Sequence, residues 1–449
     1  MNVDGRRPPR FANAAVATFA TQFAVAVLSF VSVLVVARGL GPAGRGDIAL
    51  LTTIAMLTSG LALLGIDEAN VNFAGRDPGA RRALATNSFL LAILLGGVAS
   101  LLLIIVMAFA PGVFGETDPA LRWLAVAIIP ALILKIYLKF LIGADFGFGI
   151  TNLAWLLPPA LGVVVNVALA ATGELSVTTA FVTWALAHAL ATLLLCWYVA
   201  RRGAGFGVPS LRIARRTLGF GLRSHPGRVL MAGNYRADQW FVGTLAGSRE
   251  LGLYSIAVAW SEILFYLPTA LTIVQRPYLV RAEPDEAARR AARVFRIGFA
   301  ITAVCMLSMV VVAPVLVVGA FGSAFRGATD DLRVLAFGAL GILTLKLFSN
   351  ALIAQRRPGR SSIAAAAAFA TTLALDLLLI PSYGGLGAAI ASTLAYTAGG
   401  LAACILFSRS FGVTARELLP RGRELLHACR ELWRLAARFS RRGATRTTA

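Results

Sequence analysis

Long apolar stretches, separated by short polar links, fill almost the whole chain. Each stretch has roughly 20 residues, which is enough for an α-helix to cross a bilayer. The pattern leaves no sizeable soluble domain between the stretches, and it predicts an all-α polytopic membrane protein with about twelve transmembrane helices. The predicted spans are Phe11–Ala37, Ile48–Gly65, Ala85–Ala110, Leu121–Ile142, Ile150–Ala171, Val177–Ala200, His225–Ala246, Leu251–Ile273, Val294–Ala320, Leu332–Ala354, Ser361–Leu379 and Gly385–Leu406.

Charge is distributed unevenly over the links. The chain of 449 residues has a net charge of +21. If the N-terminus is placed in the cytoplasm, most of the 42 Lys and Arg residues fall on the inner side, above all in Arg201–Ser224 and in the tail after the last span. This asymmetry follows the positive-inside rule and predicts that both termini are cytoplasmic. The excess charge therefore indicates orientation and contact with membrane lipid, and not nucleic-acid binding.

The longest link divides the chain into two sets of six spans. We predict an N-terminal six-helix bundle over 1–200, a basic cytoplasmic linker over 201–224, a C-terminal six-helix bundle over 225–408 and a basic tail over 409–449. Because six is even, both halves begin on the same side of the membrane. The two bundles are therefore expected to form a parallel repeat, related by a pseudo-two-fold axis along the membrane normal.

Similar turns occur at equivalent places in the two halves. Leu40–Ala49 and Leu245–Tyr254 each contain a glycine turn that leads straight into the next span. Asn166 precedes Gly173 much as Asp376 precedes Gly384. Chance similarity between apolar helices is the alternative explanation, and the order of the matches favours a repeat.

The tail carries apolar residues at helical spacing with arginines between them. We predict an amphipathic helix within Arg416–Arg442 that lies on the inner leaflet. Anchoring to the membrane surface is the favoured role, and docking of a partner enzyme stays open. The apolar positions are Leu425, Cys429, Leu432, Ala436 and Phe439.

Ionisable residues inside predicted spans are the best candidates for function, because a charge in hydrocarbon needs a cavity or a partner. The seventh span is the most polar and includes Asn234, Arg236 and Asp238. Arg236 and Asp238 are two residues apart, so on a helix they point to different sides and each needs another partner.

Two lysines share one face of the fourth span. Lys135 and Lys139 are four residues apart, and like charges at that spacing repel. Lys139 is close enough to the cytoplasmic end to reach the interface. For Lys135, an anionic ligand and a structural pair with Glu262 or Asp238 are equal alternatives.

Further polar residues complete the candidate set. Lys346 and Gln22 join Arg236, Lys135, Lys139 and Asn234 as residues expected to line a substrate cavity. Asp238, Asp67, Glu68, Glu262 and Asp376 are candidates for gating or for coupling to an ion. For Asp67 and Glu68, at the inner end of the second span, plain solvation is the favoured alternative.

The sequence lacks the patterns of common enzymes. It has no Walker sequence, no GxSxG and no zinc-ligand spacing, and its four cysteines form no CxxC motif. The predicted outward links are short, which argues against a polysaccharide polymerase or ligase at the outer face. We therefore predict no catalytic residues, no metal and no cofactor.

Several short motifs occur in order along almost the whole chain. They are Leu40-Gly41-Pro42 with Gly46, Arg236-Ala237-Asp238, Leu251-Gly252-Leu253-Tyr254 and Pro381–Ala391. Together they resemble the motifs of bacterial polysaccharide-transport proteins, the lipid-linked oligosaccharide (O-antigen type) flippases of the multidrug/oligosaccharidyl-lipid/polysaccharide superfamily. Asp238 fits the second-half signature of this family best.

The resemblance implies a transporter of the bacterial cytoplasmic membrane and not an enzyme. It implies two bundles around a central cavity and alternating access. The implied substrate is an oligosaccharide on a polyprenyl pyrophosphate carrier. Coupling to H⁺ or Na⁺, and partnership with a polymerase or glycosyltransferases, stay open.

From the residues we expect a cationic cavity in which Arg236 and Lys135 hold the pyrophosphate, because guanidinium suits phosphate oxygens. Asp238 would orient Arg236 or close a gate. Alternatives are a drug or metabolite exporter of the same superfamily, a polymerase or ligase, and a scaffold acting through the basic tail.

Overall fold

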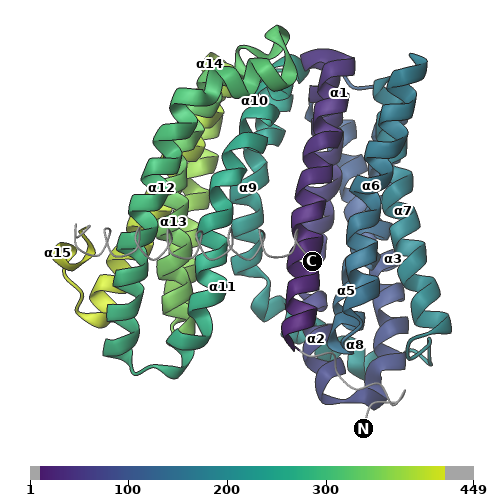
Figure 1. Cartoon of the computed structure of the whole chain (residues 1–449). Coiled ribbons are helices and arrows are strands. Elements are labelled where there is room, and N and C mark those ends of the chain that lie inside the picture. The colour runs from purple at the N-terminus through teal and green to yellow at the C-terminus, as the bar shows by residue number, and fades with distance from the viewer. Residues whose placement is uncertain (1–10, 420–449) are drawn as a thin grey trace, which may run out of the picture. The chain divides into compact units, whose positions relative to one another are not determined.

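The computed structural model describes residues 11–419 (Figure 1), and this part of the chain is almost entirely helical, with no strand. The predicted C-terminal amphipathic helix lies almost wholly outside these residues. The predicted all-α polytopic fold is confirmed. The longer helices are α1 (Phe11–Ala62), α3 (Arg81–Phe109), α5 (Ile129–Ala144), α6 (Phe148–Thr172), α7 (Val177–Arg201), α9 (Pro226–Leu245), α11 (Tyr266–Arg281), α12 (Pro284–Phe321), α13 (Ala328–Ala354) and α14 (Pro358–Phe411). The shorter ones are α2 (Ile66–Arg76), η1 (Pro78–Ala80), η2 (Pro111–Phe114), α4 (Pro119–Ala127), α8 (Leu211–Ser224), α10 (Ser248–Ser261), η3 (Glu262–Phe265), η4 (Ser323–Phe325) and α15 (Ala415–Leu418).

Nine helical stretches among the described residues are long and apolar enough to cross a membrane. Two of them, within α1 and α14, each contain two of the predicted spans, joined at Gly41 and Gly384. The backbone of both glycines has positive φ, 68° and 54°, which only glycine adopts readily. The predicted seventh span forms α9, but its polar residues keep it out of the nine.

Gly41 reverses the chain. In Figure 1, α1 rises from the lower edge of the view to its top, and α2, which follows it, lies again at the lower edge. Pro42 directly follows the reversal, where its missing N–H costs no helical hydrogen bond. The predicted glycine turn between the first two spans is therefore present.

Prolines interrupt two predicted spans. The fourth span is split at Ile128 into α4 and α5, and Pro130 occupies the first turn of α5. The eighth span is interrupted by the 3₁₀ turn η3, which begins at Glu262 and leads into Pro268 in the first turn of α11. A proline ring clashes with the carbonyl four residues earlier, so the α-helix before each proline gives way to another geometry.

The chain divides into two compact units. Among the described residues, the first comprises 11–256, 314–331 and 375–388, and the second comprises 257–313, 332–374 and 389–419. The core of the second unit contains a row of phenylalanine rings. The Phe348 ring is tilted against that of Phe295, with centroids 4.8 Å apart, and is stacked on that of Phe407, with centroids 4.6 Å apart. The predicted domain boundaries at 200 and 225 stay a prediction.

Within the first unit, the predicted basic linker (201–224) contains the helix α8. The segment before it is joined to α3 by paired hydrogen bonds. Thr86 donates to the carbonyl of Gly207 (2.7 Å) and accepts from its N–H (2.9 Å), and Asn87 makes the equivalent pair with Ser210 (2.9 and 3.1 Å). These bonds hold the start of α8 against the membrane-spanning helices.

Candidate functional site

Among the polar residues on α9, Asp238 is buried and held by hydrogen bonds. Its side chain is only 2 % exposed. The Tyr254 hydroxyl donates to Oδ2 (2.6 Å), and the Gln239 backbone N–H donates to Oδ1 (2.7 Å). Charge-assisted bonds of this kind are strong and fix the orientation of a carboxylate. The predicted residue Asp238 is therefore held rigidly between α9 and α10.

Asp376 on α14 is the second carboxyl of this region. It is fully buried, and neither of its carboxylate oxygens has a hydrogen-bond partner among the described residues. Asp376 is close enough to Asp238 to interact with it electrostatically. Two buried carboxylates that repel each other are a costly arrangement unless one binds a proton or a cation.

Arg45 adds a positive charge that our sequence analysis missed. Its side chain is half-buried, and its Nε is buried without a hydrogen-bond partner among the described residues. Arg45 interacts electrostatically with the predicted residue Arg236, which is also half-buried. The signal that could have identified Arg45 is its position inside the repeated turn, directly before Gly46.

The two lysines of α5 are positioned differently from each other. Lys139 lies over the ring of Trp155, with its Nζ 3.4 Å from the ring centroid. Lys135 is half-buried and forms no hydrogen bond and no ion pair with any residue that the structure describes. Its electrostatic neighbours are Lys139 and His188. Lys135 is thus a cation in a spanning helix whose charge the described protein does not balance.

Glu262 and Lys346 lie near each other in the second unit. The Lys346 ammonium donates to the Thr269 hydroxyl (2.8 Å) and interacts electrostatically with Glu262, where η3 begins. An acidic side chain at the break in the eighth span and a basic side chain on α13 are therefore close enough to interact electrostatically.

The remaining predicted residues occupy different surroundings. Asp67 is fully buried beside Tyr137, whose hydroxyl donates to the Leu63 carbonyl (2.8 Å). The solvated interpretation that we favoured for Asp67 is therefore wrong, because α2 continues the chain where we expected an exposed link. Glu68 is half-buried, Asn234 is fully buried, and Gln22 is exposed on α1.

The two repeated turns pack directly against each other. A Cβ added to Gly46 would lie 1.6 Å from the Ser248 carbonyl oxygen, and a Cβ added to Gly252 would lie 1.8 Å from that of Pro42. The contact is reciprocal. Each of these glycines lies five positions after the turn glycine of its own half, Gly41 or Gly247, and touches the residue that directly follows the other turn glycine.

Polar contacts surround this glycine contact, by which we mean Pro42, Gly46, Ser248 and Gly252. The Ser248 hydroxyl donates to Asp47. Nearby on α1, Arg38 donates from Nε to the Ala320 carbonyl (2.6 Å) and from an Nη to that of Gly319 (3.1 Å). The backbones of α1 and α10 therefore meet without any space between them.

Comparison with known proteins shows the family of the chain. A family model described as polysaccharide biosynthesis protein matches residues 35–330. Because it covers more than half of the chain, the protein belongs to this polysaccharide biosynthesis family, and the family relationship predicted from the sequence is confirmed. A search of curated proteins found no significant sequence match.

Solved structures share the fold at low sequence identity. The lipid II flippase MurJ in an inward closed conformation matches with a TM-score of 0.72 and 14 % identity, over 95 % of this chain and 92 % of that one. A multidrug resistance MATE transporter of the MOP superfamily, in an inward-facing conformation, matches with a TM-score of 0.71 and 16 % identity, over 89 % and 98 %. A MOP superfamily transporter from Pyrococcus furiosus, described as having a binding pocket of reverse polarity, matches with a TM-score of 0.61 and 15 % identity, over 90 % and 96 %. The chain therefore has the fold of MOP superfamily transporters.

Proposed function

We propose that this protein is a flippase that moves an oligosaccharide linked to polyprenyl pyrophosphate from the cytoplasmic to the outer leaflet by alternating access. Membership of a polysaccharide biosynthesis family supports the glycan part of the substrate. The fold shared with the lipid II flippase supports a lipid-linked substrate. The location would be a bacterial cytoplasmic membrane with both termini inside, since the basic links favour that orientation.

The observation that carries the proposal is the unbalanced charge of Lys135. A charged headgroup crosses hydrocarbon only at a prohibitive cost, so a transporter must offer it a polar, oppositely charged route. Lys135 on α5 has no acidic partner among the described residues, and Arg236 on α9 has Arg45 as a repelling neighbour. A pyrophosphate would relieve these repulsions. Lys139, held by Trp155, would add charge on the same helix.

The carboxyl pair of Asp238 and Asp376 is the candidate for ion coupling. Binding of H⁺ or Na⁺ at Asp376 would remove the repulsion from Asp238. Since the Tyr254 hydroxyl and the Gln239 N–H hold Asp238, Asp376 is the group whose occupancy would change during transport. This assigns an orienting role to Asp238 and a coupling role to Asp376.

The glycine contact is the candidate gate. In the proposed orientation it lies on the outward side, where the turns after the first and seventh spans meet. Alternating access would require α1 and α10 to separate there, and the absence of side chains between their backbones allows them to close again fully.

Reconstitution tests the assignment. Lys135→Ala and Arg236→Ala, each in proteoliposomes with a labelled polyprenyl-pyrophosphate oligosaccharide, should reduce translocation by at least about tenfold, the value of one lost charge-assisted contact to phosphate. Arg290→Ala is the matched control, since Arg290 is exposed, forms its ion pair with Glu286 on its own helix and otherwise lies over the Tyr278 ring, 6.0 Å from the centroid. Normal translocation by both cavity variants would contradict the proposal.

A drug or metabolite exporter is the second candidate, supported by the fold shared with the multidrug transporter. The same proteoliposomes separate the two. An exporter would carry a soluble organic cation and ignore the lipid-linked sugar, whereas the cations of α5 and α9 should disfavour a cationic cargo. A partner polymerase or glycosyltransferase would act on the product at the membrane, and this partnership is part of the same proposal.

A further inference from the structure

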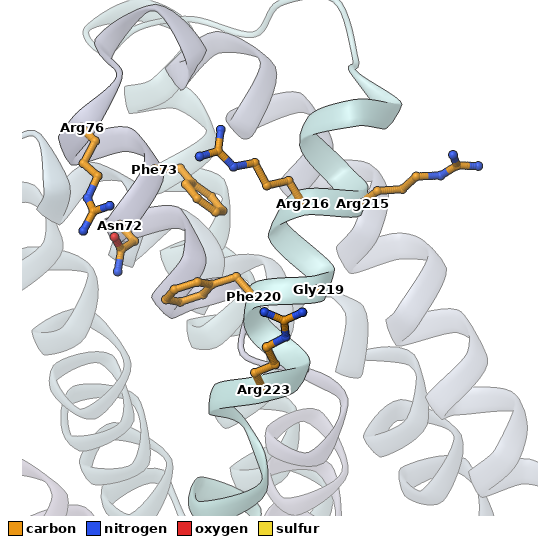
Figure 2. Close-up of a pocket in the computed structure, with 8 residues that line it drawn as sticks. All are labelled: Asn72, Phe73, Arg76, Arg215, Arg216, Gly219, Phe220 and Arg223. Atoms are coloured by element: carbon orange, nitrogen blue, oxygen red, sulfur yellow. The ribbon is translucent and has the colours of Figure 1, made fainter. Parts of the chain in front are cut away.

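A basic pocket lies between α2 and α8, and none of the residues to which we assign a role in transport lines it. It has a volume of about 490 Å³. Figure 2 shows the aromatic rings of Phe73 on α2 and Phe220 on α8 between the two helices. The side chains of Arg76, Arg216 and Arg223 lie around these rings, and that of Arg215 points away from them. The lining residues are Asn72, Phe73, Arg76, Arg215, Arg216, Gly219, Phe220 and Arg223.

The positive charge of this pocket has no acidic partner among the residues that the structure describes. Four of its eight lining residues are arginines and none is acidic. None of the four arginines forms an ion pair within the part of the chain that the structure describes. The whole of α8 contains no acidic residue. Several guanidinium groups gathered at one place without carboxylates favour an anion with several oxygens, above all a phosphate.

Close backbone packing fixes the shape of the pocket. A Cβ added to Gly221 on α8 would lie 2.3 Å from the Leu64 carbonyl oxygen, and one added to Gly65, which has a φ of 71°, would lie 2.5 Å from that of Gly221. The rings of Phe73 and Phe220 meet edge to face with centroids 5.7 Å apart. The arginines of α8 are thus held at a set distance from α2.

One guanidinium is already oriented. Arg216 lies over the Phe73 ring, with its Cζ 4.7 Å from the centroid. A stacked arginine keeps its N–H groups at the ring edge, free to donate to a ligand, and loses less freedom when the ligand binds. All four arginines of the pocket are exposed, and the contact with Phe73 distinguishes Arg216 from the other three.

Apolar groups accompany the charges. Leu211 and Leu222 of α8 are 67 % and 50 % exposed, and the two phenylalanine rings line the pocket itself. A helix with exposed leucines and arginines is typical of the interface between lipid tails and headgroups. Basic pockets between helices at this interface bind lipid phosphates. A free ion has no apolar group that could contact the leucines and phenylalanines.

We propose that the basic pocket between α2 and α8 binds the phosphate headgroup of an anionic phospholipid of the surrounding membrane. The arginines contact the phosphate, and the phenylalanines and leucines contact the glycerol and the first methylenes of the tails. The bound lipid holds α8 at the membrane surface. This proposal does not rest on the proposed transport function, because none of the residues assigned to transport lines the pocket.

Titration of the purified full-length protein in detergent tests the proposal. Bound lipid is counted by native mass spectrometry, with phosphatidylglycerol, phosphatidylcholine, a long-chain polyprenyl pyrophosphate and inorganic phosphate as separate probes. The variant is Arg76→Gln/Arg216→Gln/Arg223→Gln. The matched control is Arg212→Gln, which removes a charge from the same helix outside the pocket. Thermal stability is measured for both. It should fall by no more than about 1 kcal/mol in the triple variant, because its arginines form no ion pair with any described residue and the Arg216 guanidinium loses one contact with the Phe73 ring.

We expect the wild type to prefer phosphatidylglycerol over phosphatidylcholine. The triple variant should bind phosphatidylglycerol at least about tenfold more weakly, and the control variant less than about twofold. Equal binding by wild type and triple variant would overturn the proposal, and so would an equal loss in Arg212→Gln. Pocket-dependent binding of the polyprenyl pyrophosphate without phosphatidylglycerol would assign the pocket to the transport substrate. Equally tight binding of inorganic phosphate would make it a free-ion site.

Discussion

The glycine contact and the basic pocket are two places in the first unit where helices meet, and they are built in opposite ways. At the glycine contact, backbone touches backbone, and a single added methyl group has no space. At the basic pocket, a similar approach of Gly65 and Gly221 is placed beside an opening lined by arginines. The glycine contact therefore has no space for a ligand. At the basic pocket, the close backbone contact positions arginine side chains around an opening.

The difference indicates two uses of glycine. Between the repeated turns, glycine lets two segments close completely, which suits a contact that must form and separate. Between α2 and α8, glycine brings two helices together permanently, so that side chains on either side of the contact keep their distance. Volume should therefore matter most at the glycine contact, and charge at the basic pocket.

Gly46→Ala should give the largest effect. The added Cβ meets the Ser248 carbonyl oxygen, a backbone atom that no rotamer change can move away. Overpacking of this kind costs about 1–3 kcal/mol, so the separated state should gain population. Spin labels at the exposed positions Ala43 and Arg249 would measure this as a longer distance distribution, and transport should fall at least about tenfold if closure is required.

Gly60→Ala is the matched control for this prediction. Gly60 lies on the same helix, and a Cβ added there would have nothing within 4 Å. Alanine is the better helix former by about 1 kcal/mol, so this variant should be neutral or slightly stabilised. An unchanged distance distribution in Gly46→Ala, or an equal change in Gly60→Ala, would show that the contact does not limit the size of the side chain at position 46.

The reciprocity of the contact predicts the next effect. Gly252→Ala should resemble Gly46→Ala, because it places a Cβ against the Pro42 carbonyl in the same way. Once the two turns have moved apart, the second methyl group fits without further cost. The double variant should therefore lose clearly less thermal stability than the sum of the two single variants, by about 0.5–3 kcal/mol. Simple additivity in thermal unfolding would mean that the two glycines act separately.

The two regions also differ in how far the sequence predicted them. The spans, the charge asymmetry and the repeated turns follow from local pattern, and a glycine turn within each of Leu40–Ala49 and Leu245–Tyr254 was predicted from it. The contact between the turns was not, because reciprocity appears only when two distant segments fold together. The sequence pattern predicted two similar turns, but it did not predict that they contact each other.

The basic pocket was harder to foresee. Arg201–Ser224 reads as a basic cytoplasmic linker because its arginines satisfy the positive-inside rule. The docking of α8 depends on small features with no periodic signal, such as Gly221 and the hydrogen bonds of Asn87 with Ser210. The ionisable residues of the candidate site could each be identified from the sequence. The proximity of Asp376 to Asp238 could not, because it arises only when the distant helices α9 and α14 fold together.

Gly221→Ala tests whether backbone geometry supports the charges of the basic pocket. The added Cβ would lie 2.3 Å from the Leu64 carbonyl oxygen and must move α8, although every arginine remains. Phosphatidylglycerol binding should weaken by about threefold to tenfold, in line with the 1–3 kcal/mol cost of overpacking. Gly219→Ala is the control, since Gly219 lines the same pocket but an added Cβ there meets nothing within 4 Å. Equal affinities for the two variants in native mass spectrometry would separate the lipid site from the backbone contact.

Arg216→Lys should give the smallest effect, and it separates charge from shape within the basic pocket. Lysine keeps the positive charge but loses the planar group that lies over Phe73. An exposed cation–π contact is worth about 0.5–1 kcal/mol, so phosphatidylglycerol binding should weaken by about twofold to fivefold. Arg212→Lys, on the same helix and outside the pocket, should leave the affinity unchanged. If Arg216→Lys binds as tightly as the wild type, charge alone determines the site. A loss as large as that of the triple glutamine variant would instead show that the oriented guanidinium, and not the summed charge, recognises the phosphate.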